Sequence, residues 1–483
     1  MVWATLSKIG TGNTISKMNR QKNKTEHAYR KLSFWLDSVP ASLAPRPALE
    51  DDIEVDIAIV GGGYTGLWTA WYLKQHDPGL NIAILEAEIA GFGASGRNGG
   101  WCSAYLAGIE HWLDDPNTHD GAVRLQRQMF DAVREVGRVA QHESIDCHFE
   151  QSGALQVAVL PVQLKRLRAQ LEYMHGLGFT DEDYRWLSAD ESRNLLNIDQ
   201  SLGGLLMSHC ATIHPARLAR GLAGAVEKRQ LMFFEHTPVL EITGHRLRTL
   251  HGNVTADTIV LATEGYTDTL PGQQRRLIPL HSMMVVTEPL DAQQIEAIGS
   301  PRRLTFSNED HIVTYGQLTE DNRIAFGCRG SYYFGSKIHD FDPGEADFDV
   351  VRKTLLRFFP AIEGIHFTHA WGGAMGVSRS LRPSVNYDPA KRLAWAGGYF
   401  GNGVGASNLA GRTLADLILG RDTERVDTPW VNPGDSHDKW EPEPLRWLGI
   451  NARRQLMQLN DKAEYKGSFF APMISKMLDT LFP

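Results

Sequence analysis

Apolar runs broken by glycine clusters outline an alternating order of strands and helices along the chain. Residues 56–60 and 81–85 are β-branched or apolar runs with the length of buried strands. A glycine cluster at 61–66 separates them and leads into 67–73, which predicts a helix. Further helices are predicted over 120–142, 160–175, 215–228, 345–358 and 405–419, with strand-rich stretches at 258–263, 280–330 and 393–396. This order predicts an α/β protein.

The two ends of the chain differ from this pattern. Residues 1–32 are basic and poor in large apolar side chains, which predicts a flexible arm with order beginning near Ser33; a mitochondrial transit peptide has the same composition. Residues 426–483 form a C-terminal extension with Trp430, Trp440, Trp447 and the apolar stretch 469–474. We expect the extension to pack onto the main body, and a partner or oligomer surface is the alternative.

Composition narrows the class of protein. With 483 residues, 42% of them hydrophobic, the chain can bury a large core. Its net charge of −8 argues against nucleic acid as a partner. The four cysteines show no metal-ligand spacing, so no metal is predicted, and no apolar stretch has the length of a membrane span. We expect a cytoplasmic protein; nothing in the sequence indicates its oligomeric state.

The first glycine cluster has the spacing of a dinucleotide-binding turn. Gly61, Gly63 and Gly66 fit G-x-G-x-x-G between a strand and a helix. The glycines permit a tight turn, close approach to a pyrophosphate and close packing of the helix on the strand. Glu86 follows 20 residues later, at the end of the next strand, where a carboxylate accepts hydrogen bonds from a ribose. The sequence therefore predicts a bound dinucleotide.

That dinucleotide is NAD or FAD, and three features favour FAD. A glycine-rich loop at 91–100 directly follows the ribose carboxylate, where an extended flavin nucleotide would continue. Thr263-Glu264-Gly265 ends a strand far downstream, so the nucleotide-binding part is interrupted by an insertion. Residues 397–403 lie between a late strand and a helix whose N-terminus could stabilise negative charge on a reduced flavin.

With these motifs in place, the chain resembles the D-amino-acid-oxidase-like superfamily of FAD-dependent oxidoreductases. The branch that it resembles most contains γ-glutamylputrescine oxidoreductase and related amine oxidases. The resemblance rests on the motifs at 60–66, 93–100, 256–266, 278–290, 371–373 and 397–403, which follow one another in the family's order.

The resemblance implies two interleaved parts. A Rossmann-like FAD-binding domain would comprise 33–105, 200–270 and 365–425, and a mixed-sheet substrate domain would comprise 106–199 and 271–364. The implied reaction oxidises a C–N bond of a small-molecule amine by hydride transfer to the flavin, with hydrolysis of the imine. Oxygen or another acceptor then reoxidises the flavin.

The motifs and the resemblance together give the expected site. Cofactor contacts are expected from Gly61, Gly63, Tyr64, Thr65, Gly66, Glu86, Ala87, Ser95, Gly96, Arg97, Asn98, Gly99, Gly100, Thr263, Gly398, Gly401, Asn402, Gly403 and Val404. Catalytic candidates are His281 for proton handling, Tyr315, Arg329 as an anion clamp, and Trp371 as a wall of the pocket. Some relatives attach FAD through a histidine or a late cysteine; this chain has Asn98-Gly99-Gly100-Trp101-Cys102 and no cysteine after Cys328, so non-covalent FAD is expected.

One departure from the family bears on the substrate. Amino-acid oxidases of the superfamily often carry an α-carboxylate-binding arginine a few residues after the Trp-x-Gly motif, and that position is Met375 here. A bidentate arginine–carboxylate pair is hard to replace. We therefore expect an amine whose nitrogen is not α to a required carboxylate, unless Arg379, Arg382 or Arg329 compensates.

Three other readings share part of the pattern. A flavin-dependent monooxygenase shares the first motif but usually has Gly-Asp where this chain has Gly397-Gly398. An NAD-dependent dehydrogenase would not need the late glycine segment at 397–403. A flavoprotein that acts only as a binding module would bind FAD without turnover.

Overall fold

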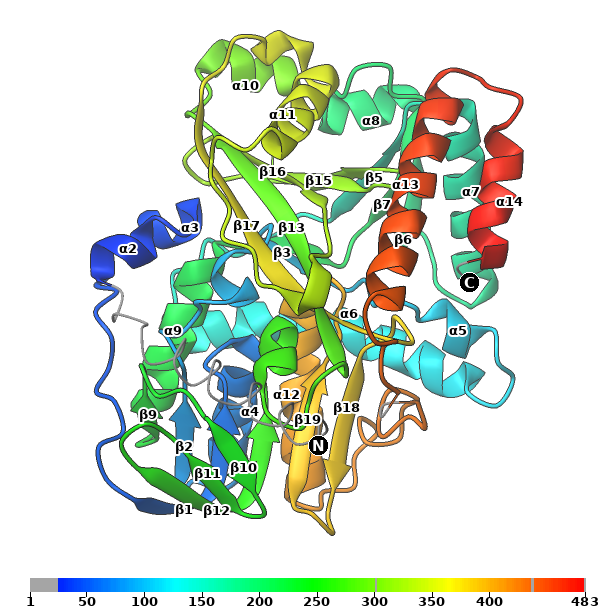
Figure 1. The fold of residues 1–483 in the computed structure, drawn as a ribbon. Helices are drawn as coiled ribbons and strands as arrows, with labels where there is room; N and C mark the ends of the chain where they lie inside the picture. The colour runs from blue at the N-terminus through cyan, green and yellow to red at the C-terminus, as the bar shows by residue number, and fades with distance from the viewer. Residues whose placement is uncertain (1–24, 300–301, 436–437, 482–483) are drawn as a thin grey trace, which may run out of the picture.

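The computed structural model describes residues 25–299, 302–435 and 438–481, and its two large sheets lie one above the other in Figure 1. The lower sheet carries the first glycine turn, and the upper sheet forms the second part of the molecule. The predicted α/β fold with two interleaved parts is confirmed. Among the described helices, none combines the length and apolarity that crossing a bilayer requires.

The first sheet has a parallel centre. Its central strands are β9 (Met232–Phe234), β2 (Ile82–Leu85), β1 (Ile53–Val60), β12 (Asn253–Leu261) and β19 (Leu393–Gly397). Antiparallel flanks are added by β10 (Glu241–Thr243), β11 (Arg246–Arg248) and β18 (Ser384–Asp388). The strands that meet at the centre are buried along most of their length, as continuous apolar runs predict.

Helices pack against this sheet and against one another: α4 (Tyr64–His76), α6 (His119–His142), α9 (Pro215–Glu227) and α12 (Gly403–Ile418). The α4–α12 contact is close, because a Cβ on Gly411 would lie 2.6 Å from the Cβ of Trp68. Trp68 and Trp71 are buried in this core. The helix that follows the glycine turn is thereby fixed on both sides.

The second sheet is mixed, in the order β17-β13-β16-β15-β14-β5-β7-β6. Its strands are β5 (Ala154–Ala158), β6 (Tyr184–Leu187), β7 (Gly203–Met207), β13 (Leu277–Thr287), β14 (Thr305–Asn308), β15 (Thr314–Leu318), β16 (Ile324–Arg329) and β17 (Phe367–Ser378). Only the β14–β5 pair is parallel among the pairs of this sheet. Further helices are α5 (Glu110–Leu113), α7 (Pro161–Gly176), α8 (Ala189–Leu195), α10 (Ala292–Ile298), α11 (Asp347–Phe358), η3 (Phe334–Ser336) and η4 (Pro360–Ile362). A small third sheet consists of β3 (Trp101–Ser103), β4 (Glu150–Gln151) and β8 (Cys210–Thr212).

Sheet membership shifts two predicted boundaries. β7 and β17 lie in segments expected to belong to the FAD-binding part, but both pair within the second sheet. β17 does so because it runs antiparallel to β13 along nearly its whole length, from Leu277 opposite Ser378 to Thr287 opposite Phe367. The crossings into the first sheet therefore come after these strands rather than at 200 and 365.

The N-terminal segment is ordered earlier than the sequence suggests. Residues 1–24 of the predicted arm lie outside the described residues, whereas α2 (Glu26–Arg30) and α3 (Phe34–Asp37) are packed on the main body. Tyr29 is fully buried, and its hydroxyl donates to Glu88 at 2.8 Å. The basic composition of the segment gave no indication that Tyr29 is buried.

The C-terminal extension divides into a packed part and an exposed part. Trp430 is fully buried, and the Trp440 indole donates to the Val377 carbonyl at 2.8 Å. The chain then forms the hairpin of α13 (Leu445–Tyr465) and α14 (Ala471–Leu481), shown in orange and red in Figure 1. Phe469 and Phe470, between these helices, are exposed, so the expectation of packing is wrong for the apolar stretch at 469–474.

Candidate functional site

A cavity of about 730 Å³ joins the two sheets. On one side it is lined by the glycine turn and by the ends of β1 and β12, at Val60 and Ala262. On the other side it is lined by the second sheet, including Ser282, Tyr315 and Arg329. A nucleotide bound at the turn can therefore extend to a reaction chamber against the second sheet.

The first turn has the geometry that requires glycine. Gly61 has φ = +112°, and a Cβ there would lie 2.5 Å from the Ala262 carbonyl oxygen. A Cβ on Gly66 would lie 2.1 Å from the Gly61 carbonyl oxygen. The turn therefore lets α4 begin directly against β1, and Gly63, Tyr64 and Thr65 at this helix N-terminus line the cavity, where a pyrophosphate fits.

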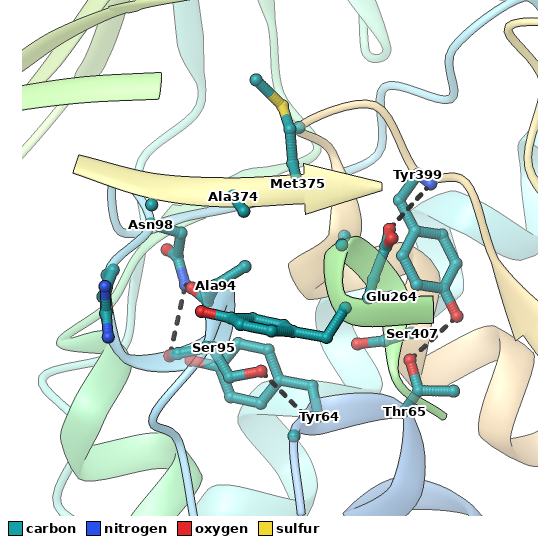
Figure 2. Close-up of a pocket in the computed structure, with 18 of the residues that line it drawn as sticks. Tyr64, Thr65, Ala94, Ser95, Asn98, Glu264, Ala374, Met375, Tyr399 and Ser407 are labelled. Atoms are coloured by element: carbon teal, nitrogen blue, oxygen red, sulfur yellow. Dashed lines mark hydrogen bonds between the residues drawn. The ribbon is translucent and has the colours of Figure 1, made fainter. Parts of the chain in front are cut away.

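The loop at 91–100 is fixed against this turn. The Tyr64 backbone N–H donates to Ser95 Oγ at 2.9 Å (Figure 2). Ser95 belongs to the short helix η1 (Ala94–Gly96), and the Asn98 side-chain amide, just after this helix, donates to the Ala94 carbonyl at 3.1 Å. The loop thus presents Ser95, Arg97 and Asn98 to the cavity.

Three side chains hold consecutive carbonyls of the same loop from behind. Ser33 Oγ donates to the carbonyl of residue 96 at 2.8 Å, Trp371 Nε1 to that of 97 at 2.9 Å, and Trp35 Nε1 to that of 98 at 2.8 Å. The N-terminal segment therefore contributes to the shape of the cofactor site.

Glu86 lies at the end of β2 with its carboxylate held in place. Its oxygens accept from the backbone N–H groups of Gly62 at 2.7 Å and Glu88 at 3.0 Å. Burial raises the pKa of Glu86 to about 7, with the nearby Glu235 and Glu88 adding to the shift. This carboxylate lines the cavity, where a ribose hydroxyl can donate to it.

Glu264 is a cavity residue that sequence reasoning missed. It begins η2 (Glu264–Thr269), directly after the predicted Thr263, and accepts from the Tyr399 backbone N–H at 3.1 Å (Figure 2). Burial raises its pKa to about 7. A Cβ on Gly376 would lie 1.7 Å from Glu264 Oε2, so this carboxyl group sits directly on β17 and joins it to the loop before α12.

Most of the predicted cofactor residues line the cavity. These are Gly61, Gly63, Tyr64, Thr65, Glu86, Ala87, Ser95, Arg97, Asn98, Gly99, Thr263, Gly401, Asn402, Gly403 and Val404. Gly66, Gly96, Gly100 and Gly398 do not line it. Gly66 and Gly96 serve close packing, because a Cβ on either would meet a backbone carbonyl at 2.1 or 2.2 Å, and Gly100 and Gly398 have φ of +76° and +78°.

The four catalytic candidates divide in two. Tyr315 and Arg329 line the cavity, whereas His281 and Trp371 do not. His281 Nε2 accepts from the His339 backbone N–H at 3.1 Å, and Nδ1 donates to the Ser331 carbonyl at 3.3 Å. Burial lowers the pKa of His281 to about 4, so it is a neutral structural histidine. Trp371 is a support of the 91–100 loop instead of a wall of the chamber.

The side chains of Arg329 and Met375 both lie next to Gly401. A Cβ on Gly401 would lie 3.4 Å from Met375 Sδ and 3.6 Å from both Nε and Nη2 of Arg329. The guanidinium stacks on Phe400, 4.9 Å from the ring centroid, and burial lowers its pKa. Within the described residues no carboxylate pairs with it. A half-buried cation that faces a cavity and has no carboxylate partner among the described residues fits an anionic ligand group.

The other two arginines considered are occupied elsewhere. Arg379 pairs with Glu441 at 2.9 Å on the surface. Arg382 pairs with Asp435 and lies over the Trp112 ring. Neither lines the cavity, so Arg329 alone of the three is placed to compensate for Met375.

Tyr315 is oriented by a short relay. Ser282 Oγ donates to the Cys328 carbonyl at 3.0 Å, so the Tyr315 hydroxyl donates to Ser282 Oγ. Burial raises the pKa of Tyr315 to about 12, which keeps the phenol protonated. The phenol oxygen retains a lone pair that can accept an N–H from a ligand.

Other residues that line the chamber belong to no recognisable sequence motif. Tyr105, Gln156, Ser307 and Ser407 line the cavity, and Tyr105 donates to Gln156 at 2.7 Å. They come from separate strands and helices that meet only in the fold, so no sequence spacing marks them. The four cysteines are free and buried, and none lines the cavity.

Comparison with known proteins agrees with this site. The DAO family, described as FAD dependent oxidoreductase, matches residues 56–417. The chain is 31% identical over 409 residues to gamma-glutamylputrescine oxidoreductase of Escherichia coli (strain K12), covering 83% of this chain and 91% of that protein. It is 24% identical to glycine oxidase of Bacillus licheniformis, covering 78% and 95%.

Solved structures share the fold. Glycine oxidase from Geobacillus kaustophilus superposes with a TM-score of 0.64 at 20% identity, covering 77% of this chain and 96% of that one. L-proline dehydrogenase from P. horikoshii gives 0.64 at 17% identity, covering 79% and 98%.

A glycine turn of the dinucleotide-binding type, a carboxylate that fits a ribose and a cavity between two sheets are the features of an FAD-dependent oxidoreductase, and the family comparison gives the same class. The chain belongs to the DAO family of these enzymes. The glycine turn, Glu86 and the start of α12 are the residues of this chain that fit FAD.

Removing the Glu86 carboxylate should weaken FAD binding more than it slows the chemical step. Losing hydrogen bonds to a charged acceptor costs about 1.5–3 kcal/mol, so Glu86→Ala should lower FAD affinity about 10- to 100-fold in titrations of apo-protein. Glu54→Ala, an exposed acid on the same sheet, is the control and should change nothing. Unchanged FAD affinity in Glu86→Ala would show that Glu86 is misassigned.

The same carboxyl group should make FAD binding depend on pH. Its pKa is about 7 without a ribose partner, and hydroxyl donors favour the ionised form, so binding lowers that pKa. FAD affinity should therefore be full above pH 7 and fall as pH drops below it, by at most about tenfold per unit. Glu86→Gln should flatten this dependence; an equally steep profile in the variant would assign it to another group.

FAD should be released intact by acid precipitation. The buried Cys102 and the other cysteines lie outside the cavity lining, and Asn98 occupies the loop where some relatives carry a histidine. The yellow colour should appear in the supernatant, and flavin that stays on the pelleted peptide would contradict non-covalent binding.

Proposed function

We propose that this enzyme oxidises a C–N bond of an amine or amino acid derivative that carries an anionic group, and that the imine then hydrolyses. The single observation that carries the proposal is the unpaired Arg329 guanidinium in the chamber beside Met375. Substrates that contain an amine nitrogen are supported by the relatives gamma-glutamylputrescine oxidoreductase, glycine oxidase and sarcosine oxidase subunit beta.

The chain's own residues give each part of the reaction a place. Held by the glycine turn, Glu86 and the start of α12, FAD would supply the hydride acceptor that oxidation of a carbon next to nitrogen requires. Arg329 binds the anionic group and so fixes the distance of that carbon from the cofactor. The Tyr315 oxygen accepts an N–H of the substrate and orients its nitrogen lone pair. The chamber lies between the glycine turn and the second sheet, so a bound substrate is held between the cofactor site and Tyr315 and Arg329.

Arg329 changes the expectation drawn from Met375. That expectation left open whether Arg379, Arg382 or Arg329 compensates, and of these three arginines only Arg329, on β16, lies beside Met375 at the cavity. An anionic group is therefore proposed as part of the substrate, on the α carbon or further along the molecule.

We further propose that the protein acts in the cytoplasm, which its four free, buried thiols support, with oxygen or another acceptor reoxidising the flavin.

The test is kcat/KM for three matched substrates: a simple amine, its α-carboxylated counterpart and an isomer with the carboxylate at the far end. At least one carboxylated amine should exceed the simple amine by tenfold or more, and kcat/KM should rise with pH as the amine deprotonates. Equal values for all three would contradict an anion-binding role of Arg329.

A further inference from the structure

The hairpin of α13 and α14 carries an unusual share of exposed apolar surface. Most of the large apolar side chains that are exposed in the described residues belong to it: Leu445, Trp447, Leu448, Leu459, Phe469, Phe470, Met473 and Met477. Phe469, in the turn between the helices, has 92% of its full exposure, and the neighbouring Phe470 has 59%. The hairpin lies at the edge of the part of the molecule formed by the second sheet, beside α7 (Figure 1).

The inner face of the hairpin is polar and firmly attached. Glu464 pairs with Arg166 at 2.8 and 3.2 Å, and the Asp461 carboxylate accepts the backbone N–H groups of His311 and Ile312 at 2.8 and 3.0 Å. These acids and His311 lie close together, but their oxygens are occupied by the protein itself, so they serve as an anchor.

The outer face of the hairpin carries positive charge. Lys462, Lys466 and Lys476 are exposed, and none of them is in an ion pair with a described residue. The chain as a whole has a net charge of −8, whereas this outer face carries positive charge beside aromatic side chains. We call the outer residues Leu459, Lys462, Lys466, Phe469, Phe470, Met473, Lys476 and Met477 the hairpin tip.

We propose that the hairpin tip docks on an anionic lipid surface. Basic residues around protruding aromatic and thioether side chains match a bilayer interface, where apolar groups enter the acyl boundary and lysines meet the headgroups. A second copy of this chain fits less well, because a two-fold contact of the tip with itself would set lysines against lysines. Protein interfaces are also depleted in lysine at their centres.

Docking at the tip leaves the catalytic chamber unobstructed, since no tip residue lines the cavity. The proposal is therefore independent of the proposed substrate, and the enzyme would act at the membrane surface without crossing it.

Sedimentation of the FAD-loaded protein with vesicles tests the proposal. The protein should sediment with mixed phosphatidylcholine–phosphatidylglycerol vesicles and far less with pure phosphatidylcholine. Each lysine near an anionic surface contributes about fivefold in affinity, so changing all three to Gln should weaken binding about 100-fold. High salt should weaken it as well.

Matched variants separate docking from damage to the fold. Phe469→Ser with Phe470→Ser should abolish sedimentation while flavin content and amine oxidation stay unchanged, and Val350→Ser, an exposed apolar residue on α11, should bind vesicles as the wild type does. Absence of binding to anionic vesicles, or binding that the Phe variant leaves intact, would overturn the proposal. A concentration-dependent dimer that the Phe variant dissolves would assign the tip to a second copy instead.

Discussion

Arg329→Met should lower kcat/KM for the preferred carboxylated amine by about 30- to 5,000-fold. Truncating one partner of a buried, hydrogen-bonded charge pair costs about 2–5 kcal/mol, because the other charge is left buried without a partner. The side chain of methionine retains the packing against Phe400 and beside Met375 but cannot donate to a carboxylate. Most of the loss should appear in KM, since the anionic group is bound in the ground state as well.

Two comparisons make this result specific. For an amine without a carboxylate, Arg329→Met should act as the wild type does or better, because no charge is left unpaired. Arg379→Met, which removes an arginine paired with Glu441 outside the cavity, should leave both substrates unaffected. An equal loss for charged and uncharged amines would show that Arg329 supports the fold instead of binding substrate.

Gly66→Ala should remove most FAD binding. The added methyl group would lie 2.1 Å from the Gly61 carbonyl oxygen, so α4 must move away from β1 or the turn must open. Overpacking of this kind costs about 1–3 kcal/mol or more, and here it acts on the helix N-terminus that fits the pyrophosphate, so FAD affinity should fall about 5- to 150-fold or more. Titration of apo-protein with FAD measures it.

The control for this change is Gly224→Ala. Gly224 is also a helical glycine, in α9, but a Cβ there meets nothing within 4 Å, so the substitution should leave FAD binding intact and stabilise the helix by about 0.5–1 kcal/mol. If Gly66→Ala bound FAD as tightly as Gly224→Ala, the turn would not be the pyrophosphate site.

Local features of the site could be predicted because a few adjacent residues determine them. The glycine turn is one such feature, since its spacing and the flanking strand and helix are all within about 30 residues. Glu86 is another, because its place at the end of the next strand fixes where its carboxylate points. Both line the cavity as expected.

Features that depend on strand pairing could not be predicted in the same way. His281 and Ser282 are neighbours on β13, and successive side chains of a strand point to opposite faces. Ser282 lines the cavity, so His281 faces away. Choosing between them required the register of β13 with β16 and β17, which also brings Arg329 beside Met375.

The segments at the two ends show a different limit. Composition predicts whether a segment can be solvated but not whether one aromatic side chain in it is buried against the main body, as Tyr29 is. The opposite holds for Phe469, whose apolar character suggests burial although the hairpin leaves it exposed.

Anaerobic titration of the purified yellow protein with a carboxylated amine tests the central claim most directly. We expect the visible absorbance of oxidised flavin to disappear without any nicotinamide cofactor. An aldehyde or keto acid should form in an amount equal to the flavin reduced. Bleaching by NADPH but by none of the amines would contradict it and assign the protein to monooxygenase chemistry, while flavin that no amine and no nicotinamide reduces would leave a binding module.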